Sequence, residues 1–129
     1  MRVLAIDYGA KRVGLAVGET DSELVLPAGK LEREDDDSLA KVVAEKVSAE
    51  QIGLVVVGEP LGMSGKPTEQ TKRASGFVDC LRKHVSVPVE LSDERLTSKE
   101  ADRALGQNTH SRDELSAMRL LETYLLRRK

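Results

Sequence analysis

The first twenty residues constrain the fold more than any other segment, because they describe two strands joined at a carboxylate and a glycine turn. Residues 3–6 are all apolar, which is typical of a strand buried on both faces. Asp7 ends this run, and residues 13–17 return as a second strand that contains Gly14. Glycine inside a strand often marks the close approach of another backbone or a ligand. A carboxylate on a rigid strand end beside a glycine turn is well placed to bind a metal ion or a phosphate–metal complex.

Length and composition predict a single domain over residues 1–129. A chain of 129 residues, 40% of them hydrophobic, can bury one core but cannot hold a second lobe of similar size. No apolar run approaches the length of a membrane span, and Asp7 interrupts the apolar run at the N-terminus, so we expect neither a signal peptide nor a membrane partner. The single cysteine, Cys80, excludes an internal disulfide framework and zinc pairs of the Cys-x-x-Cys kind. We therefore expect a cytoplasmic protein.

Charge and aromatic content limit how this chain could bind nucleic acid. The net charge of −2 argues against general polyanion binding by bulk electrostatics. With two Tyr, one Phe and no Trp, stacking on unpaired bases cannot be the main means of recognition. Nucleic-acid contacts would therefore go chiefly through phosphates.

The remaining pattern alternates strands with helices. We expect strands at 2–7, 12–18, 24–30, 51–57 and 87–91, and helices at 36–48, at 68–84, from Thr97 or Ser98 to Leu105, and at 112–127. This order predicts an α/β fold with a five-stranded mixed sheet. An antiparallel meander of three strands is followed by two parallel strands, which are reached through right-handed helical crossovers.

Acidic residues follow three of the predicted strands. Asp7, Glu59 and the pair Asp93 and Glu94 each come directly after an apolar run. In an open α/β sheet the ligand crevice lies outside the carboxyl ends of the parallel strands, so these acids should gather at one edge. Asp113 opens the last helix above a stripe of apolar residues that should face the body of the protein.

Gathered carboxylates point to metal chemistry. They repel one another, and their pKa values rise unless a cation lies among them. Hard oxygen ligands without cysteine or paired histidine favour Mg²⁺ or Mn²⁺ over zinc. Two such ions can activate a water and stabilise the leaving oxygen of a phosphodiester. The residues therefore predict metal-dependent phosphodiester hydrolysis.

Each acid also has a purely structural interpretation. Asp7 could accept hydrogen bonds from the amides of the glycine turn, as Asp commonly does. Asp113 lies inside a Ser-x-x-Glu capping box and could serve the start of the helix. Residues 93–95 could form a salt bridge at a turn, and Glu59 could be a solvated loop acid.

The two histidines and the cysteine are expected outside the chemistry. His84 and His110 are interpreted as surface residues, although His110 could contact phosphate from a polar loop. Cys80 lies on the predicted 68–84 helix and is expected to be a small buried apolar residue rather than a nucleophile.

Four motifs, taken together, resemble one protein family along essentially the whole chain. They are Asp7-Tyr8-Gly9 with Lys11-Arg12-Val13-Gly14, Val57-Gly58-Glu59-Pro60-Leu61 with Gly65, Asp93-Glu94-Arg95-Leu96-Thr97, and Asp113 ahead of Ser116-Ala117. In this order and at this spacing they resemble the YqgF (RuvX) family. The resemblance implies an RNase H-like fold with helices on both faces of a five-stranded sheet. Family members are described as nucleases acting at the 5′ end of pre-16S rRNA in ribosome biogenesis, and also as Holliday junction resolvases by analogy with the RuvC type.

The resemblance also implies roles for particular residues. Asp7, Glu94 and Asp113 correspond to metal-binding catalytic acids, and Arg95 to a phosphate or structural partner of that cluster. Mg²⁺ or Mn²⁺ is the implied cofactor.

The chain departs from the family pattern at two acids. Glu59 stands where the family usually has Leu, and Glu114 stands where it more often has Ser. Both therefore stay open as further ligands, and so does Asp93.

Basic residues border the predicted acid cluster. Lys11, Arg12, Lys66 and Arg95 are the expected contacts to a nucleic-acid backbone, and Lys72, Arg73 and Lys99 lie near them in the predicted arrangement. Phosphate contacts position a backbone without reading its sequence. The expected substrate is structured RNA, a pre-rRNA, on family grounds, with branched four-way DNA as the alternative and a monomer or homodimer as the acting species.

Two other function classes fit parts of the sequence. The Asp-x-Gly-x4-Gly hairpin also resembles the phosphate loop of actin-like and sugar-kinase ATPases, but those proteins enclose ATP between two lobes and this chain supplies one. A non-catalytic binding module is the third class, and the acids at all three strand-end positions named above count against it.

Overall fold

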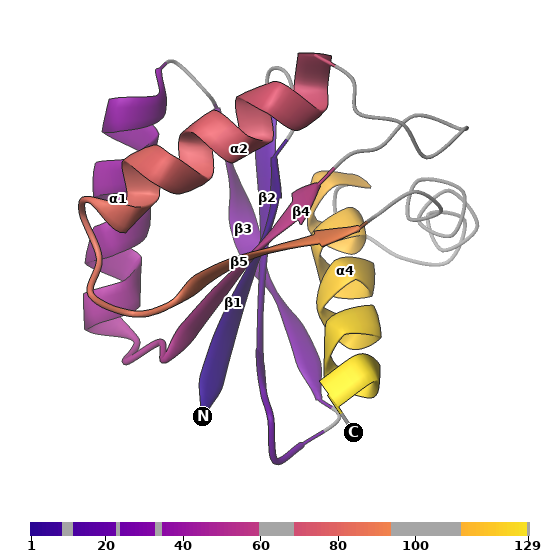
Figure 1. Ribbon diagram of the computed structural model, residues 1–129. Coiled ribbons are helices and arrows are strands. Elements are labelled where there is room, and N and C mark those ends of the chain that lie inside the picture. Colours follow the sequence, from indigo (N-terminus) through magenta and orange to yellow (C-terminus); the bar gives the residue numbers. More distant parts are fainter. Residues whose placement is uncertain (9–11, 23, 33–34, 60–68, 94–111, 129) are drawn as a thin grey trace.

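The computed structural model describes residues 1–8, 12–22, 24–32, 35–59, 69–93 and 112–128 (Figure 1). Its elements are β1 (Arg2–Tyr8), β2 (Arg12–Glu19), β3 (Val25–Glu32), α1 (Asp36–Ala49), β4 (Leu54–Glu59), α2 (Glu69–Arg82), β5 (Val89–Asp93) and α4 (Arg112–Arg128). These elements confirm the predicted ones to within a few residues at each end. The short helix expected between 97 and 105 lies outside the described residues.

The strands form one mixed sheet in the order β3-β2-β1-β4-β5. The β1–β2 and β2–β3 pairs are antiparallel, whereas the β1–β4 and β4–β5 pairs are parallel. This confirms the predicted meander of three strands followed by two parallel strands. Helices α1 and α2 cover one face of the sheet and α4 covers the other (Figure 1). No helix within the described ranges is both long enough and apolar enough to cross a bilayer.

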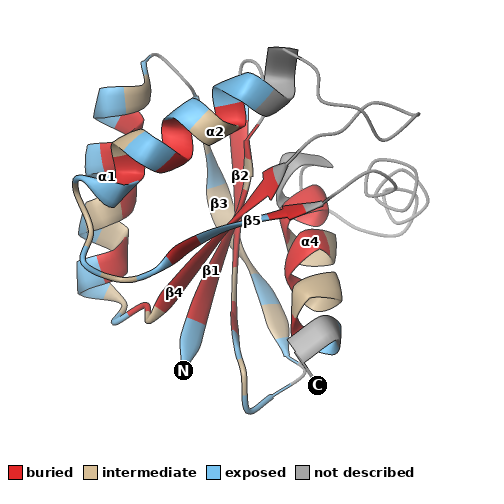
Figure 2. Ribbon diagram, in the orientation of Figure 1, coloured by how far each residue is buried: buried red, intermediate tan, exposed pale blue. Residues whose placement is uncertain are grey.

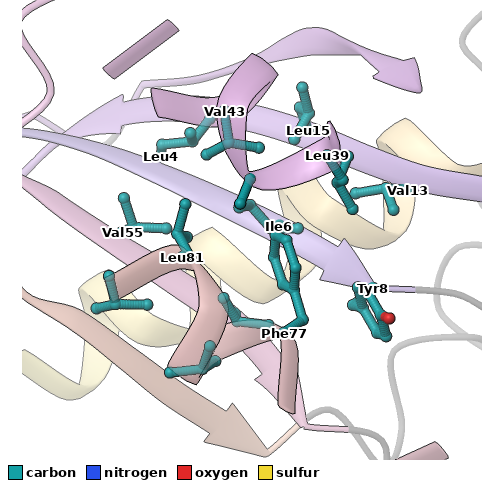
Figure 3. Packing of buried hydrophobic residues seen from close by; sticks show 14 of the residues in the cluster. Leu4, Ile6, Tyr8, Val13, Leu15, Leu39, Val43, Val55, Phe77 and Leu81 are labelled. Atoms are coloured by element: carbon teal, nitrogen blue, oxygen red, sulfur yellow. The ribbon is translucent and has the colours of Figure 1, made fainter. Parts of the chain in front are cut away.

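Large side chains fill the face of the sheet that α1 and α2 cover. Leu4, Ile6 and Tyr8 alternate along β1 and belong to one core cluster with Val43 of α1 and Phe77 of α2 (Figure 3). The rings of Tyr8 and Phe77 are stacked with their centroids 5.0 Å apart. Fully burying one such side chain contributes about 1.5–3 kcal/mol, so this layer supplies much of the stability of the fold.

Smaller side chains fill the opposite face, under α4. Val3 and Ala5 of β1 pack in a second cluster with Ala117 and Leu121 of the helix. At Gly18 of β2, a Cβ would lie 3.0 Å from a backbone oxygen and 3.1 Å from a methyl carbon of Leu121. The helix can therefore approach the sheet this closely because β2 has a glycine there. Figure 2 marks the buried residues along the central strands and along part of α4.

Helix α1 begins at a side-chain cap. The Asp35 carboxylate accepts a hydrogen bond of 2.8 Å from the backbone N–H of Ser38. Asp36 and Asp37 follow in the first turn, where negative charge interacts favourably with the helix dipole. This start confirms the helix expected from residue 36.

The end of α1 corrects the predicted start of the next strand. Gln51 adopts a left-handed φ of 55°, and the N–H of Ile52 donates to the carbonyl of Val47 at 3.0 Å. A left-handed residue just past a helix satisfies its last carbonyls and turns the chain. Residues 51–53 are used in this turn, so β4 begins at Leu54 and not at 51.

Candidate active site

Asp7 lies on the face of the sheet that α4 covers. Successive side chains of a strand point to opposite faces, and Val3 and Ala5 of β1 pack against α4. Asp7 continues that series and is half-buried. Strand β1 therefore supplies large apolar side chains to the core under α1 and α2, and it presents a carboxylate on the face that α4 covers.

Glycine occupies both positions beside Asp7 in the sheet. On β2 its Cα partner is Gly14. On β4 the neighbour is Gly58, because Ile6 pairs with Val57 one residue earlier. Both glycines are buried, so neither neighbouring strand places a side chain next to the Asp7 carboxylate. The sequence predicted a close approach at Gly14, and the register shows that this glycine stands opposite Asp7.

Ser92 of β5 extends this row by one strand. Its Cα partner is Gly58, and it is one of two polar residues buried in the described parts of the chain, at 8% exposure. The other is Ser116 of α4, at 6% exposure. A row across four strands at the carboxyl end of β1 thus offers a carboxylate, two glycines and a hydroxyl.

The first turn of α4 lies at the same end of the sheet as Asp7. Gly18, which contacts Leu121, is the Cα partner of Val3 at the start of β1. From Leu121 back to Asp113 the helix rises about 12 Å, and from Val3 to Asp7 the strand rises about 13 Å. The helix before Leu121 is thus long enough to reach the carboxyl end of β1, and Figure 1 shows α4 beginning at the end of the sheet where β4 and β5 finish.

Helix α4 is held against the sheet along one stripe. Ala117 and Leu120 are buried, and Tyr124 packs partly buried beside them, as the sequence predicted. The Tyr124 hydroxyl donates a hydrogen bond to the Glu90 carboxylate of β5. These contacts fix the helix that carries Asp113.

The acids expected just past their strands are the final or penultimate strand residues instead. Asp7 precedes Tyr8, the last residue of β1, while Glu59 and Asp93 end β4 and β5 and are Cα partners. The predicted strands end one or two residues too early, because strand pairing continues through the acidic residues. Glu59 and Asp93 are brought together at the same carboxyl edge, as predicted.

Several predicted site residues lie outside the described residues. They are Glu94, Arg95, Lys11, Lys66, Lys99 and His110, together with Gly9 of the turn that could bond Asp7. Glu114 is the third residue of α4. Arg12 begins β2 and is exposed, and Lys72 and Arg73 are exposed near the start of α2.

A hydrogen bond holds the end of β1 from the opposite face. The Tyr8 hydroxyl donates to the Asp36 carboxylate of α1 at 2.6 Å. Tyr8 is 1% exposed and follows Asp7 directly, so this bond anchors the strand end that carries the carboxylate. The partners are 28 residues apart, and no spacing in the sequence indicated the contact.

A second polar group lies between α1 and α2. His84, expected at the surface, is half-buried, and its Nε2 lies 3.1 Å from a carboxylate oxygen of Asp37. That hydrogen bond, followed by the one from Lys41, holds the pKa of Asp37 below its ordinary value. Cys80, expected to be buried, packs partly buried against the core, and burial raises the pKa of its thiol. The spacing of four between Cys80 and His84 could have indicated a shared helix face, but nothing pointed to Asp37.

Sequence relatives match this chain over nearly its full length. The sequence model of a family described as "RuvX: Holliday junction resolvase" matches residues 1–127. A protein of Maridesulfovibrio salexigens is 34% identical, with 98% of this chain and 99% of the relative covered. One of Koribacter versatilis is 37% identical, with 98% and 88% covered. Both are named "Putative pre-16S rRNA nuclease".

Solved structures share the fold. Thermus thermophilus RuvC matches with a TM-score of 0.60 at 17% identity, covering 99% of this chain and 96% of RuvC. The fowlpox virus resolvase, in a complex with its substrate Holliday junction DNA, matches with a TM-score of 0.63 at 12% identity, covering 98% of each chain. These likenesses confirm the RNase H-like fold.

Proposed function

Because the chain belongs to the RuvX family, we propose that it is a divalent-metal-dependent nuclease that processes the 5′ end of pre-16S rRNA. The observation that carries this proposal is the placement of Asp7 in a row of glycines, on the face and at the end of the sheet where α4 begins. A half-buried carboxylate that is flanked by glycine on both neighbouring strands is a candidate ligand for a divalent cation.

The residues at this edge fit a hard cation. Asp7, Asp113 and Glu94, which directly follows β5, supply carboxylate oxygens, the ligands that Mg²⁺ and Mn²⁺ prefer. Such ions, when bound, activate a water and stabilise the leaving oxygen of a phosphodiester. Glu59 and Asp93 end β4 and β5 at this edge, one residue beyond Gly58 and Ser92. Strand alternation assigns them to the opposite face from Asp7, so we leave them out of the proposed ligand set.

The chain's own groups would orient the substrate. The first turn of a helix has backbone N–H groups without intrahelical acceptors and carries the positive end of the helix dipole, so the start of α4 would favour an anionic phosphate. Lys11, Arg12, Lys66 and Arg95 would contact phosphates along the backbone. Arg12 is exposed two residues before Gly14, on the strand that flanks Asp7. Since phosphate contacts carry no sequence information, selectivity would come from the shape of the structured RNA.

Cleavage of branched DNA is the second candidate. The two structural neighbours that support it are a RuvC and a viral resolvase, each described in complex with its Holliday junction substrate. A resolvase must nick two strands symmetrically, so this reading requires a homodimer.

The test compares two substrates under the same conditions. Purified protein is given a pre-16S rRNA 5′ leader or a four-way DNA junction, with Mg²⁺, with Mn²⁺ or with EDTA. We expect cleavage of the RNA with either ion and none with EDTA. Preferred cleavage of the junction would establish the resolvase alternative instead.

Asp7→Asn is the decisive variant in that assay. It removes one ligand charge while keeping the shape of the side chain, so the loss of several kcal/mol of transition-state stabilisation should lower the rate by about 10²–10³-fold. Asp79→Asn makes the same chemical change on an exposed part of α2 and should leave the rate unchanged. Full activity in Asp7→Asn would overturn the proposal.

A further inference from the structure

Three side chains that can ligate a metal converge between α1 and α2. Asp37 lies in the first turn of α1, Cys80 lies on α2, and His84 follows two residues after α2 ends. Their ligand atoms all lie within 4.8 Å of one another. The backbone N–H of His84 donates to the carbonyl of Leu81 at 2.9 Å, so the helical path continues and keeps Cys80 and His84 on one side.

The donor set differs from that of the candidate active site. It offers one sulfur, one imidazole nitrogen and one carboxylate oxygen, which suits Zn²⁺ and not Mg²⁺. We propose that Asp37, Cys80 and His84 bind a Zn²⁺-class ion that joins α1 to α2. Water would complete a four-coordinate site, since three protein ligands leave one position open.

The geometry requires only small side-chain rotations. Zn²⁺ bonds of about 2.0–2.3 Å place tetrahedral ligand atoms about 3.5 Å apart. The His84 Nε2 and an Asp37 oxygen are already 3.1 Å apart. The thiol is within 4.8 Å of both and needs to close by at most about 1.3 Å to reach ligand distance.

The carboxylates around Cys80 favour a cation. Burial is the largest cause of the raised pKa of the Cys80 thiol. The neighbouring carboxylates of Asp37 and Asp36 raise this pKa further, and the ammonium group of Lys83 lowers it. Binding converts the thiol to a metal-bound thiolate and releases its proton to solvent, which removes this repulsion. The Lys41 ammonium lies 3.3 Å from one carboxylate oxygen of Asp37, and the second oxygen of that carboxylate faces His84.

This site is separate from the candidate active site. Cys80 packs against the α1/α2 core, on the face of the sheet opposite Asp7. An ion that binds the folded state alone stabilises it by mass action, so Zn²⁺ should raise the melting temperature of the protein.

The test is a titration of the full chain with Co²⁺, which reports thiolate coordination by a charge-transfer band. We expect the band to saturate at one equivalent, to disappear when Zn²⁺ is added and to be unaffected by excess Mg²⁺. Cys80→Ser should abolish it, and His84→Gln and Asp37→Asn should each weaken binding at least tenfold. Asp7→Asn, Asp79→Asn and His110→Gln are matched controls and should bind as the wild type does.

A second measurement needs no variant. Cys80 is the single cysteine of the chain, so alkylation by iodoacetamide reports this site alone. Zn²⁺ should protect it with the same dissociation constant as the Co²⁺ competition, and Mg²⁺ should not. Absence of a thiolate band and unprotected alkylation at saturating Zn²⁺ would overturn the proposal, as would wild-type Zn²⁺ binding by folded Cys80→Ser.

Discussion

The two faces of the sheet receive different side chains from the same strand. Toward α1 and α2, β1 presents Leu4, Ile6 and Tyr8, each at most 1% exposed. Toward α4 it presents Val3, Ala5 and Asp7, which decrease in apolar volume toward the carboxyl end. The first series ends in a stacked ring that also hydrogen-bonds α1, and the second ends in a half-buried carboxylate.

Under the proposed function, residues that stabilise the fold alternate along β1 with the residue that binds the metal. Because side chains alternate along a strand, one face can be packed tightly while the other supplies a ligand at the same level. The rigid face then fixes the backbone that positions the carboxylate, as a site built on a strand requires. Substitutions on the α1/α2 face should therefore change stability, and substitutions around Asp7 should change activity.

The largest effect on stability is expected at Phe77. It is fully buried and stacked on Tyr8, so Phe77→Ala should lower the free energy of unfolding by about 3–5 kcal/mol. Urea denaturation measures this loss. Leu126→Ala, at a residue that is 67% exposed on α4, is the control and should change stability by less than about 0.5 kcal/mol. Equal effects of the two changes would contradict the described core.

An opposite pattern is expected at Gly14. A methyl group there would stand beside the Asp7 carboxylate, so Gly14→Ala should reduce cleavage at least tenfold, while the free energy of unfolding changes by about 1 kcal/mol or less. Steady-state kinetics and urea denaturation of the same preparation measure both. Gly76→Ala is a matched control, because a Cβ at Gly76 on exposed α2 meets nothing within 4 Å. Gly76→Ala should retain activity. Unchanged cleavage by Gly14→Ala would contradict the proposed role of the space beside Asp7.

The smallest effect is expected at Tyr8. Tyr8→Phe keeps the stacked ring but removes the hydrogen bond to Asp36, which should cost about 1 kcal/mol of stability. Cleavage should stay within a few-fold of the wild type, since Tyr8 faces away from the candidate site. Urea denaturation and cleavage kinetics measure the two effects. A large loss of activity without a loss of stability would show that Tyr8 acts in cleavage and does not only stabilise the fold.

Much of the fold could be predicted because local pattern and global fold agree. The apolar runs of β1 and β4 are uninterrupted, as strands buried on both faces require, and the aspartates at residues 35–37 mark the start of α1. The first residues of β4 were misplaced because Gln51 takes a left-handed conformation that is usually adopted by glycine.

The site could be predicted only in part, because its geometry depends on register. The sequence shows that Asp7 ends an apolar run and that Gly14 lies inside the next predicted strand. That these two residues are partners, and that Gly58 lies on the other side, follows from pairing between strands. The contact of His84 with Asp37 spans 47 residues and belongs to the packing of two helices, which no local pattern encodes.

We propose that Asp7 of β1 and Asp113 of α4 hold the same divalent cation. Calorimetric titration of Mn²⁺ into the wild type, Asp7→Asn, Asp113→Asn and the double variant tests it most directly. If the carboxylates share an ion, each single variant should weaken binding at least tenfold, and the double variant should be little weaker than either, because coupled sites are not additive. Wild-type affinity in either single variant, or losses that add in full, would contradict the claim.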